Sequence, residues 1–353
     1  MSKFQTSSKE RLPAEPMRPV VDPAAWTRDT LGPVDNFSYR LTDEDRASIV
    51  EAVAATRAKG VAVADVSREN FSINGPFADV IADVHDELKT GRGLIMLRGF
   101  PVEQLDREGC AIGYLGIGSY LGQAMAQNMK GHILGHVKDL GGDYADPTTR
   151  GYYTRAEMRI HSDPCDYVGL LCLQTAKKGG ASCVTSSITV YNTMLKTRPD
   201  LVQELVNEIY RSKKGDVNPG EQAWFKQPIF SFHEGYFSAV GLGVSIDRAE
   251  GLPGVPPFSE ALKEAIKVYR EVAEDTLVDI PFLPGDIQFL NNYVALHTRR
   301  EYEDWPEDSR KRHLLRLWLS DPDSRPIPPE HRQGYRGRGL LPQGVKLNAP
   351  LDV

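Results

Sequence analysis

The chain has 353 residues, 41% of them apolar and 25% charged, which is typical of a globular protein and unlike collagenous, coiled-coil or disordered sequences. The net charge of −6 argues against nucleic-acid binding, because proteins that bind nucleic acid normally carry a basic excess or stripe. No apolar run approaches the roughly 18 residues that span a bilayer. We therefore expect neither a nucleic-acid nor a membrane partner.

The N-terminus and the cysteines predict a cytoplasmic location. Residues 1–16 are polar, carry both charge signs and lack the apolar core of a secretory signal. The four cysteines form no Cys-x-x-Cys pair, and a chain of this length can bury a core without disulfides. We expect reduced thiols.

The first third of the chain is predicted to be mainly helical. A Pro-rich polar arm over residues 1–40 precedes Thr42, a potential N-cap that is followed by acidic residues and by apolar residues at helical spacing. Further helices are predicted over residues 77–88 and 105–121, with a buried strand over 93–101 between them.

Strands dominate the rest of the chain. Apolar runs between Gly-rich turns predict strands over residues 133–140, 167–175, 182–187, 285–292 and 312–320, and a strand pair over 228–242.

Two helices and one long polar stretch interrupt these strands. Helical spacing returns over residues 189–206, broken by a proline, and over 258–276. Residues 141–155 show no clear period, and a loop of that length is a candidate lid. Its Tyr152 and Tyr153 either face a substrate or simply pack.

This order of elements predicts an α+β fold built on an antiparallel, jelly-roll-like barrel with helices packed outside it. We expect an arm over residues 1–40, a single domain over 41–320 with a helical first part, and an irregular Pro/Gly-rich tail over 321–353.

His161 and Asp163 are a candidate pair of metal ligands. They are separated by one residue and lie next to predicted strands, and in an extended segment residues i and i+2 point to the same face. With a second histidine they would form a two-histidine, one-carboxylate triad with open positions, which selects non-haem iron(II) used with oxygen. About one such pair is expected by chance among 8 histidines and 48 acidic residues. The other match, His85 with Glu87, lies in a predicted helix and is interpreted as a solvated helix end.

The third ligand has to come from elsewhere in the chain. The remaining histidines are His132, His136, His233, His297, His313 and His331. His297 follows a strand that ends in Asn291-Asn292, which places it at a strand end near a barrel mouth. For the others, the ordinary interpretation is a surface or core histidine with satisfied hydrogen bonds.

The segment 311–320 is strand-like and apolar but contains two arginines. A period of two places Arg312 and Arg316 on one face, with Leu314 and Trp318. A buried guanidinium is costly without an anionic partner, and its planar fork suits a carboxylate. The residues alone leave two alternatives open: internal Asp/Glu partners, or the carboxylates of a small molecule.

Four ordered motifs carry a family resemblance. They are Arg159-Ile-His-Ser-Asp163, the segment from Val168 to the Gly-Gly-Ala-Ser182 turn, the segment from Gly285 through Asn291-Asn292 to His297, and Arg312-His-Leu-Leu-Arg316. With these motifs the chain resembles the taurine dioxygenase-like (TauD/TfdA) family of iron(II)/2-oxoglutarate oxygenases over about residues 90–320. The resemblance implies a distorted jelly-roll (double-stranded β-helix, cupin-like) core with flanking helices.

The resemblance also implies the metal ligands. His161, Asp163 and His297 would bind iron(II), which 2-oxoglutarate would chelate. Because Asp163 is present, whereas family halogenases have a small residue there, halogenation is disfavoured.

Three further residues take family positions around the co-substrate. Arg312 would pair with the distal carboxylate of 2-oxoglutarate, and Ser182 would hydrogen-bond the same group. Arg316 occupies a position that holds an anionic group of the substrate in some relatives, or it shares the 2-oxoglutarate pocket. The segment between His297 and Arg312 is longer than in taurine dioxygenase, and the residues before His161 do not match it, so taurine itself is not implied.

The implied reaction uses O2 to hydroxylate an unactivated C–H bond of a small anionic substrate, an amino acid or other carboxylate, with release of succinate and CO2. Desaturation, cyclisation and epoxidation with the same cofactors are alternatives. Arg312 and Ser182 disfavour a zinc hydrolase, and the intact triad disfavours a non-catalytic jelly-roll binding protein. Whether the protein is a homo-oligomer stays open.

Overall fold

The computed structural model describes residues 7–142, 153–213, 217, 220–331 and 344–352. Its α-helices are α1 (Arg28–Leu31), α2 (Asp43–Ala58), α3 (Pro76–Thr90), α4 (Arg107–Gly118), α5 (Ser187–Thr197), α6 (Pro199–Val206), α7 (Val244–Asp247), α8 (Glu260–Asp275) and α9 (Pro329–His331). None of these helices has the length and apolarity needed to cross a membrane.

Sixteen strands are present in the described part of the chain, more than the sequence predicts. They are β1 (Ser38–Arg40), β2 (Leu94–Arg98), β3 (Gln123–Ala124), β4 (Leu134–Val137), β5 (Tyr167–Gln174), β6 (Lys178–Gly179), β7 (Ser182–Ser186), β8 (Ile209–Ser212), β9 (Trp224–Gln227), β10 (Phe230–His233), β11 (Tyr236–Ala239), β12 (Val278–Ile280), β13 (Ile287–Asn291), β14 (Ala295–Arg299), β15 (Tyr302–Glu303) and β16 (His313–Ser320).

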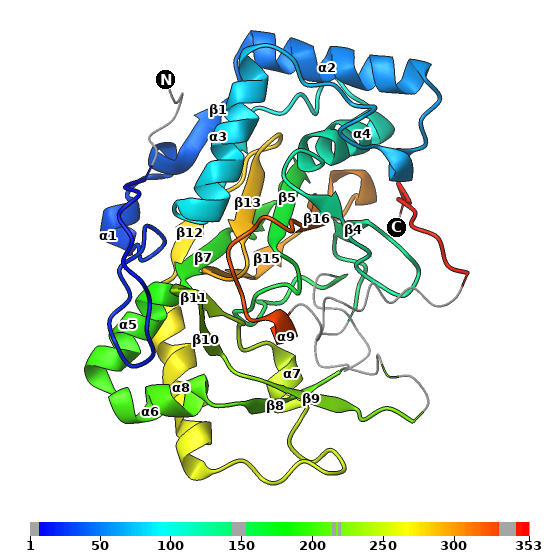
Figure 1. The fold of residues 1–353 in the computed structure, drawn as a ribbon. Helices are drawn as coiled ribbons and strands as arrows, with labels where there is room; N and C mark the ends of the chain where they lie inside the picture. The colour runs from blue at the N-terminus through cyan, green and yellow to red at the C-terminus, as the bar shows by residue number, and fades with distance from the viewer. Residues whose placement is uncertain (1–6, 143–152, 214–216, 218–219, 332–343, 353) are drawn as a thin grey trace.

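Two sheets form the centre of the molecule. The larger has the order β1-β2-β13-β5-β16-β3, with β4 also paired to β16, and the smaller has the order β12-β7-β14. Their pairs are antiparallel except β1 with β2. Figure 1 shows α2, α3 and α4 at one end of the sheets and α5, α6 and α8 at the other. The fold is therefore mixed α and β with an antiparallel core, as predicted, although the sheets do not close into a barrel within the described residues.

The start of α2 follows directly from the sequence. The Thr42 side chain accepts a hydrogen bond from the backbone N–H of Asp45, and the Asp45 carboxylate accepts one from the N–H of Thr42. This capping box satisfies two N–H groups that a helix end otherwise leaves unpaired. The predicted N-cap is confirmed.

Strand β16 shows why two arginines enter the interior. Leu315 and Leu317 pack into the core shared with α2, α3 and α4, whereas Leu314 packs into a second core between the two sheets. Because strand side chains alternate, Arg312 and Arg316 point to the side of Leu314, between the sheets. The predicted period of two is confirmed.

Several elements differ from the sequence-based expectation. Ser38–Arg40, expected in the arm, pairs in parallel with β2 as an edge strand. The β8–β9 pair was not predicted, because its short strands are rich in polar residues. The candidate lid falls mostly outside the described residues, Tyr152 included. Glu87, expected to be solvated, is fully buried and pairs with Arg92 at 3.0 Å.

Residues 344–352 are attached to the larger sheet next to β4. Asn348 forms a β-bridge with His132, and the Pro350 carbonyl lies 2.7 Å from Nε2 of His136. A carbonyl only accepts, so Nε2 of His136 carries hydrogen and its Nδ1 accepts from Nε2 of His313, 2.9 Å away. Burial lowers the pKa of His136, and burial, followed by the neighbouring His136, lowers the pKa of His313 to about 3, so both imidazoles are neutral at pH 7.

This histidine pair makes stability depend on pH. Unfolded His313 binds a proton near its ordinary pKa of about 6.5, whereas folded His313 binds one only near pH 3, so stability falls as pH drops below about 6.5. The parent should lose unfolding free energy when the pH is lowered from 7.5 to 5.5. In His313→Gln this loss should be about 1 kcal/mol smaller, as measured by urea denaturation of the metal-free proteins. His233→Gln, at a half-exposed histidine, is the matched control. Equal slopes in all three proteins would contradict this role.

Candidate active site

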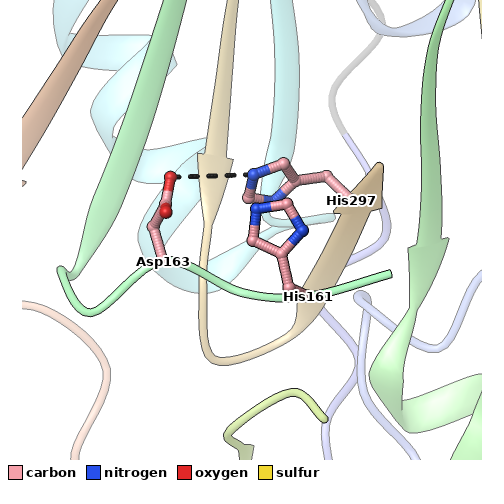
Figure 2. Close-up of side chains that lie close together, drawn as sticks. All are labelled: His161, Asp163 and His297. Carbon is pink, nitrogen blue, oxygen red and sulfur yellow. Dashed lines mark ion pairs between the residues drawn. The ribbon is translucent and has the colours of Figure 1, made fainter. Parts of the chain in front are cut away.

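His161, Asp163 and His297 come together at the edge of the space between the sheets. One ligand atom from each lies within 4.8 Å of the others. Figure 2 shows Asp163 and His161 on one extended segment and His297 on β14, with the three side chains converging. Nε2 of His297 is 3.7 Å from Oδ2 of Asp163. The structure thus brings together the three residues that the sequence analysis selected.

Backbone hydrogen bonds fix the two ligand-bearing segments to each other. His161 and His297 form an isolated antiparallel bridge in which each N–H donates to the other's carbonyl, at 3.0 and 2.9 Å. The side-chain oxygen of Asn292 accepts the N–H of Asp163 at 2.9 Å. Nδ1 of His161 lies 2.8 Å from the Arg159 carbonyl, so Nδ1 carries hydrogen and the lone pair of the neutral ring is on Nε2.

The expected position of His297 was wrong in one respect. It was placed at a strand end, but it occupies the centre of β14, paired with Val184 of β7. After β13 ends at Asn291, a tight turn returns the chain at once into a second strand. The polar Thr-Arg-Arg that follows His297 hid this strand from the sequence pattern.

The buried charges suit a cation. Burial alone would raise the pKa of Asp163, but the positive charge of Arg316, followed by the two histidines, lowers it below its ordinary value. Burial, followed by the neighbouring His161, lowers the pKa of His297 to about 3. Oδ2 of Asp163 and Nδ1 of His297 are buried and have no hydrogen-bond partner in the described chain. A carboxylate and neutral imidazoles are ligands that a divalent metal ion takes.

A cavity with an empty volume of about 450 Å³ opens beside the two histidines. Arg312, Arg316 and Ser182 all line it. Among the described residues no carboxylate lies within 4 Å of the Arg312 guanidinium; Nη2 donates to the Gly180 carbonyl at 3.2 Å, and Nη1 has no partner. The described chain therefore provides no internal acidic partner for the Arg312 guanidinium, which was one of the two alternatives.

Arg316 has a different environment in the same cavity. Its Nη1 lies 3.5 Å from Oδ1 of Asp163, and its Nε donates to the side-chain oxygen of Gln127 at 2.8 Å. Arg316 therefore has an internal acidic partner, and that partner is one of the three candidate metal ligands.

Ser182 lies on β7 at the same cavity. Its hydroxyl donates to Oε1 of Gln288 at 2.9 Å, and Nε2 of Gln288 is buried without a partner in the described chain. Ser182 and Gln288 therefore lie on β7 and β13, and Arg312 directly precedes β16. Their donors are suited to an anion.

Sequence reasoning missed Gln288, Asn292, Gln127 and Arg299. Arg299 lines the cavity two residues after His297, and the alternation along a strand would have placed it there had β14 been recognised. Asn292 was quoted within a motif but given no role. Gln127 carried no signal, because it reaches Arg316 across 189 residues of sequence.

The Gly-Gly turn before Ser182 makes room for Arg312. Gly179 and Gly180 have φ values of 77° and 74°, in the region that favours glycine. A Cβ on Gly180 would lie 3.0 Å from Nε of Arg312 and 3.2 Å from Cβ of Tyr302. The turn therefore allows the guanidinium to reach its observed place.

Comparison with known proteins identifies the family. The sequence profile of the taurine catabolism dioxygenase TauD, TfdA family matches residues 57–318. The chain belongs to this family. It is 31% identical to FR-33289 synthase of Streptomyces rubellomurinus (strain ATCC 31215) over 328 residues, and this alignment covers 90% of this chain and 96% of the relative. It is 29% identical to the taurine hydroxylase-like protein SAT17 of Stachybotrys chartarum (strain CBS 109288 / IBT 7711) over 316 residues, and this alignment covers 85% of this chain and 79% of the relative.

Solved structures with the same fold are non-haem iron oxygenases. Asparagine oxygenase in complex with Fe(II), 3-hydroxyasparagine and succinate superposes with a TM-score of 0.65 at 18% identity, over 89% of this chain and all of the other. The oxygenase OrfP in complex with Fe and alpha-ketoglutaric acid (2-oxoglutarate) superposes with a TM-score of 0.62 at 14% identity, over 80% of this chain and 93% of the other.

The TauD/TfdA family protein described here is an iron(II)- and 2-oxoglutarate-dependent dioxygenase. This confirms the predicted enzyme class and cofactors, and it sets aside the zinc hydrolase and the non-catalytic binding protein. The donor set at His161, Asp163 and His297 and the anion-binding side chains beside it fit the two cofactors.

The glycine turn gives a test that changes no polar group. We expect Gly180→Ala to displace the Arg312 guanidinium and to weaken 2-oxoglutarate binding about tenfold, measured by calorimetric titration of the anaerobic iron(II) protein.

Gly60→Ala is the matched control for the turn. Gly60 has φ 68°, but nothing lies within 4 Å of an added Cβ, so the variant carries the same backbone strain without the clash. It should bind 2-oxoglutarate as the parent does. Equal affinity in both variants would show that the turn does not position Arg312.

Proposed function

We propose that the protein hydroxylates an unactivated C–H bond of a small anionic substrate, with iron(II) held by His161, Asp163 and His297. The observation that carries the proposal is Arg312, a buried guanidinium without an acidic partner among the described residues, in the cavity that opens at the two histidines. We propose further that the two facing sheets are the halves of a distorted jelly roll, which the family supports.

Each side chain has a defined task in this proposal. Bound iron(II) and 2-oxoglutarate supply the oxidising chemistry, in which O2 is consumed and succinate and CO2 are released. Arg312 pairs with the distal carboxylate of 2-oxoglutarate, for which Nη1 is available. The Ser182 hydroxyl donates to the same carboxylate. Because this hydroxyl has one proton, the carboxylate competes for it with Oε1 of Gln288.

The walls of the cavity and the Arg159 carbonyl assist these groups. Leu170, Leu314 and Phe282 keep the co-substrate site apolar between its charged ends, which strengthens charge pairing there and excludes water. The Arg159 carbonyl holds His161 in the tautomer that presents Nε2 as a ligand.

Arg316 is proposed to face an anionic group of the primary substrate, an amino acid or other carboxylate. Two solved relatives of the fold support an amino-acid substrate, since they hold hydroxyasparagine and, for OrfP, hydroxyarginine. Because Arg316 also lies against Asp163, it would bring that group close to the metal. Desaturation, cyclisation or epoxidation would follow from the same site if the substrate presented a different hydrogen to the iron.

The co-substrate assignment is tested by anaerobic titration of iron(II) and 2-oxoglutarate, with the visible absorption of their chelate as the readout. We expect Arg312→Leu to bind iron(II) normally but to weaken 2-oxoglutarate about 100-fold, because it loses a charge-assisted pair worth roughly 3 kcal/mol. Arg310→Leu, a nearby exposed arginine, is the control, and His161→Ala should abolish the chelate. An unchanged affinity in Arg312→Leu would refute the pocket.

The role of Arg316 is tested once a substrate has been found by screening for succinate release. We expect Arg316→Leu to raise the KM for the primary substrate at least tenfold more than the KM for 2-oxoglutarate, because only the substrate loses its counter-charge. Equal increases in the two KM values would instead assign Arg316 to the co-substrate cavity.

A further inference from the structure

A second cavity lies against the segment that carries His161 and Asp163. It has an empty volume of about 590 Å³, is partly open to solvent, and is lined on one side by Ser162, Asp163 and Pro164. The opposite wall comes from the insertion between β7 and β12 and includes Arg211 of β8 and Ser245 of α7. Neither Arg312 nor Arg316 lines it, so it is distinct from the co-substrate cavity.

Arg211 is a buried cation at the wall of this cavity. Its side chain is 2% exposed, and no carboxylate lies within 4 Å of it in the described chain. Burial lowers its pKa to about 10, which still leaves it charged at neutral pH. A buried guanidinium without an anion is costly, and the cost falls when an anion binds.

The guanidinium retains donors for such an anion. Nε, Nη1 and Nη2 donate to the carbonyls of Gln227, Gly241 and Val240 at 3.3, 3.3 and 3.0 Å. These bonds use three of the five N–H groups of arginine and hold the fork in one orientation. Two N–H groups are left, which is the number that a bidentate oxyanion takes.

The cavity contains little negative charge to compete. Asp163 is the acidic residue that lines it, and Arg316 already lies 3.5 Å from that carboxylate. His331 and Ser245 add polar groups to the lining. The lining thus contains one guanidinium and one carboxylate, and because that carboxylate already has a cationic neighbour, Arg211 is the charged group in the wall that lacks a counter-ion among the described residues.

The cavity is connected to the metal ligands through short contacts. The N–H of Gly241 donates to the Ser162 hydroxyl at 2.9 Å, and a Cβ on Gly241 would lie 2.7 Å from the Ser162 backbone nitrogen. Arg211 thus holds Val240-Gly241, and Gly241 lies directly against the residue between His161 and Asp163. A group bound at Arg211 would be close to the ligand segment.

We infer that this second cavity receives an oxyanion of the primary substrate, with Arg211 as its counter-charge and specificity-determining residue. The inference rests on the proposed function, because it assumes a substrate that reacts at the adjacent triad. The oxyanion at Arg211 is a group of the substrate other than the one proposed to face Arg316, and Arg211 has no acidic partner among the described residues.

The first test uses inorganic phosphate as the probe and metal-free protein. Phosphate should raise the Tm of the parent at millimolar concentration beyond the effect of KCl at equal ionic strength. Arg211→Leu should weaken this response at least tenfold, Arg211→Lys should weaken it less, and Arg312→Leu should keep it. No response in the parent, or a response lost in Arg312→Leu and kept in Arg211→Leu, overturns the site. Parallel titration with acetate shows whether a carboxylate or a phosphate-like group binds more tightly.

A second measurement does not depend on the folding of a variant. Crystals of the parent soaked in phosphate should show the anion within about 3.5 Å of the Arg211 guanidinium, and its absence there would overturn the inference. In the succinate-release assay phosphate should compete with the primary substrate and not with 2-oxoglutarate; non-competitive behaviour would overturn the substrate assignment. The iron(II)–2-oxoglutarate chelate should still form in Arg211→Leu, so a parent without chelate would indicate failure of the proposed function instead.

Discussion

Positive charge between two β-sheets is the constraint on which the rest of the site depends. Strand alternation directs Arg312 and Arg316 to the inner side of the larger sheet, together with the leucine between them. The described chain provides the carboxylate of Asp163 near Arg316 and none near Arg312. In the apolar space between the sheets a charge without a partner is costly, and the proposed pairing of Arg312 with a dianionic co-substrate would relieve that cost. Under that proposal, the stability of this region and the binding of 2-oxoglutarate are linked.

The same region shows what a sequence can predict. Two rules of short range made His161, Asp163 and the two arginines candidates: residues i and i+2 share a face of an extended segment, and strand side chains alternate. The cap of α2 followed from one local pattern. The roles expected for Arg312 and Ser182 came from the family resemblance; the family is confirmed, and the two roles stay predictions.

What the sequence did not predict depends on contacts distant along the chain. Gln127 reaches Arg316 from the loop that follows β3, and the side chain of Asn292, in the turn between β13 and β14, accepts the N–H of Asp163. The clearance that Gly180 gives to Arg312 is visible only when β7 and β16 are placed together. Strand β14 itself was missed because its sequence is short and polar on one side, so His297 was placed at a strand end although it lies in the middle of a strand. Its role as a metal ligand stays a prediction.

The pairing of β14 with β7 has a consequence for how this site can change over time. His297 lies opposite Val184, and Arg299 lies opposite Ser182, so one ladder aligns the proposed metal ligand and the proposed co-substrate residue. A slip by a single residue would turn Leu296 and Thr298 inward and carry both functional side chains out of the site. Insertions and deletions are therefore barred from this ladder, whereas the chain between β7 and β12 is free to lengthen. New substrate specificities would arise by remodelling that insertion around an unchanging pair of strands.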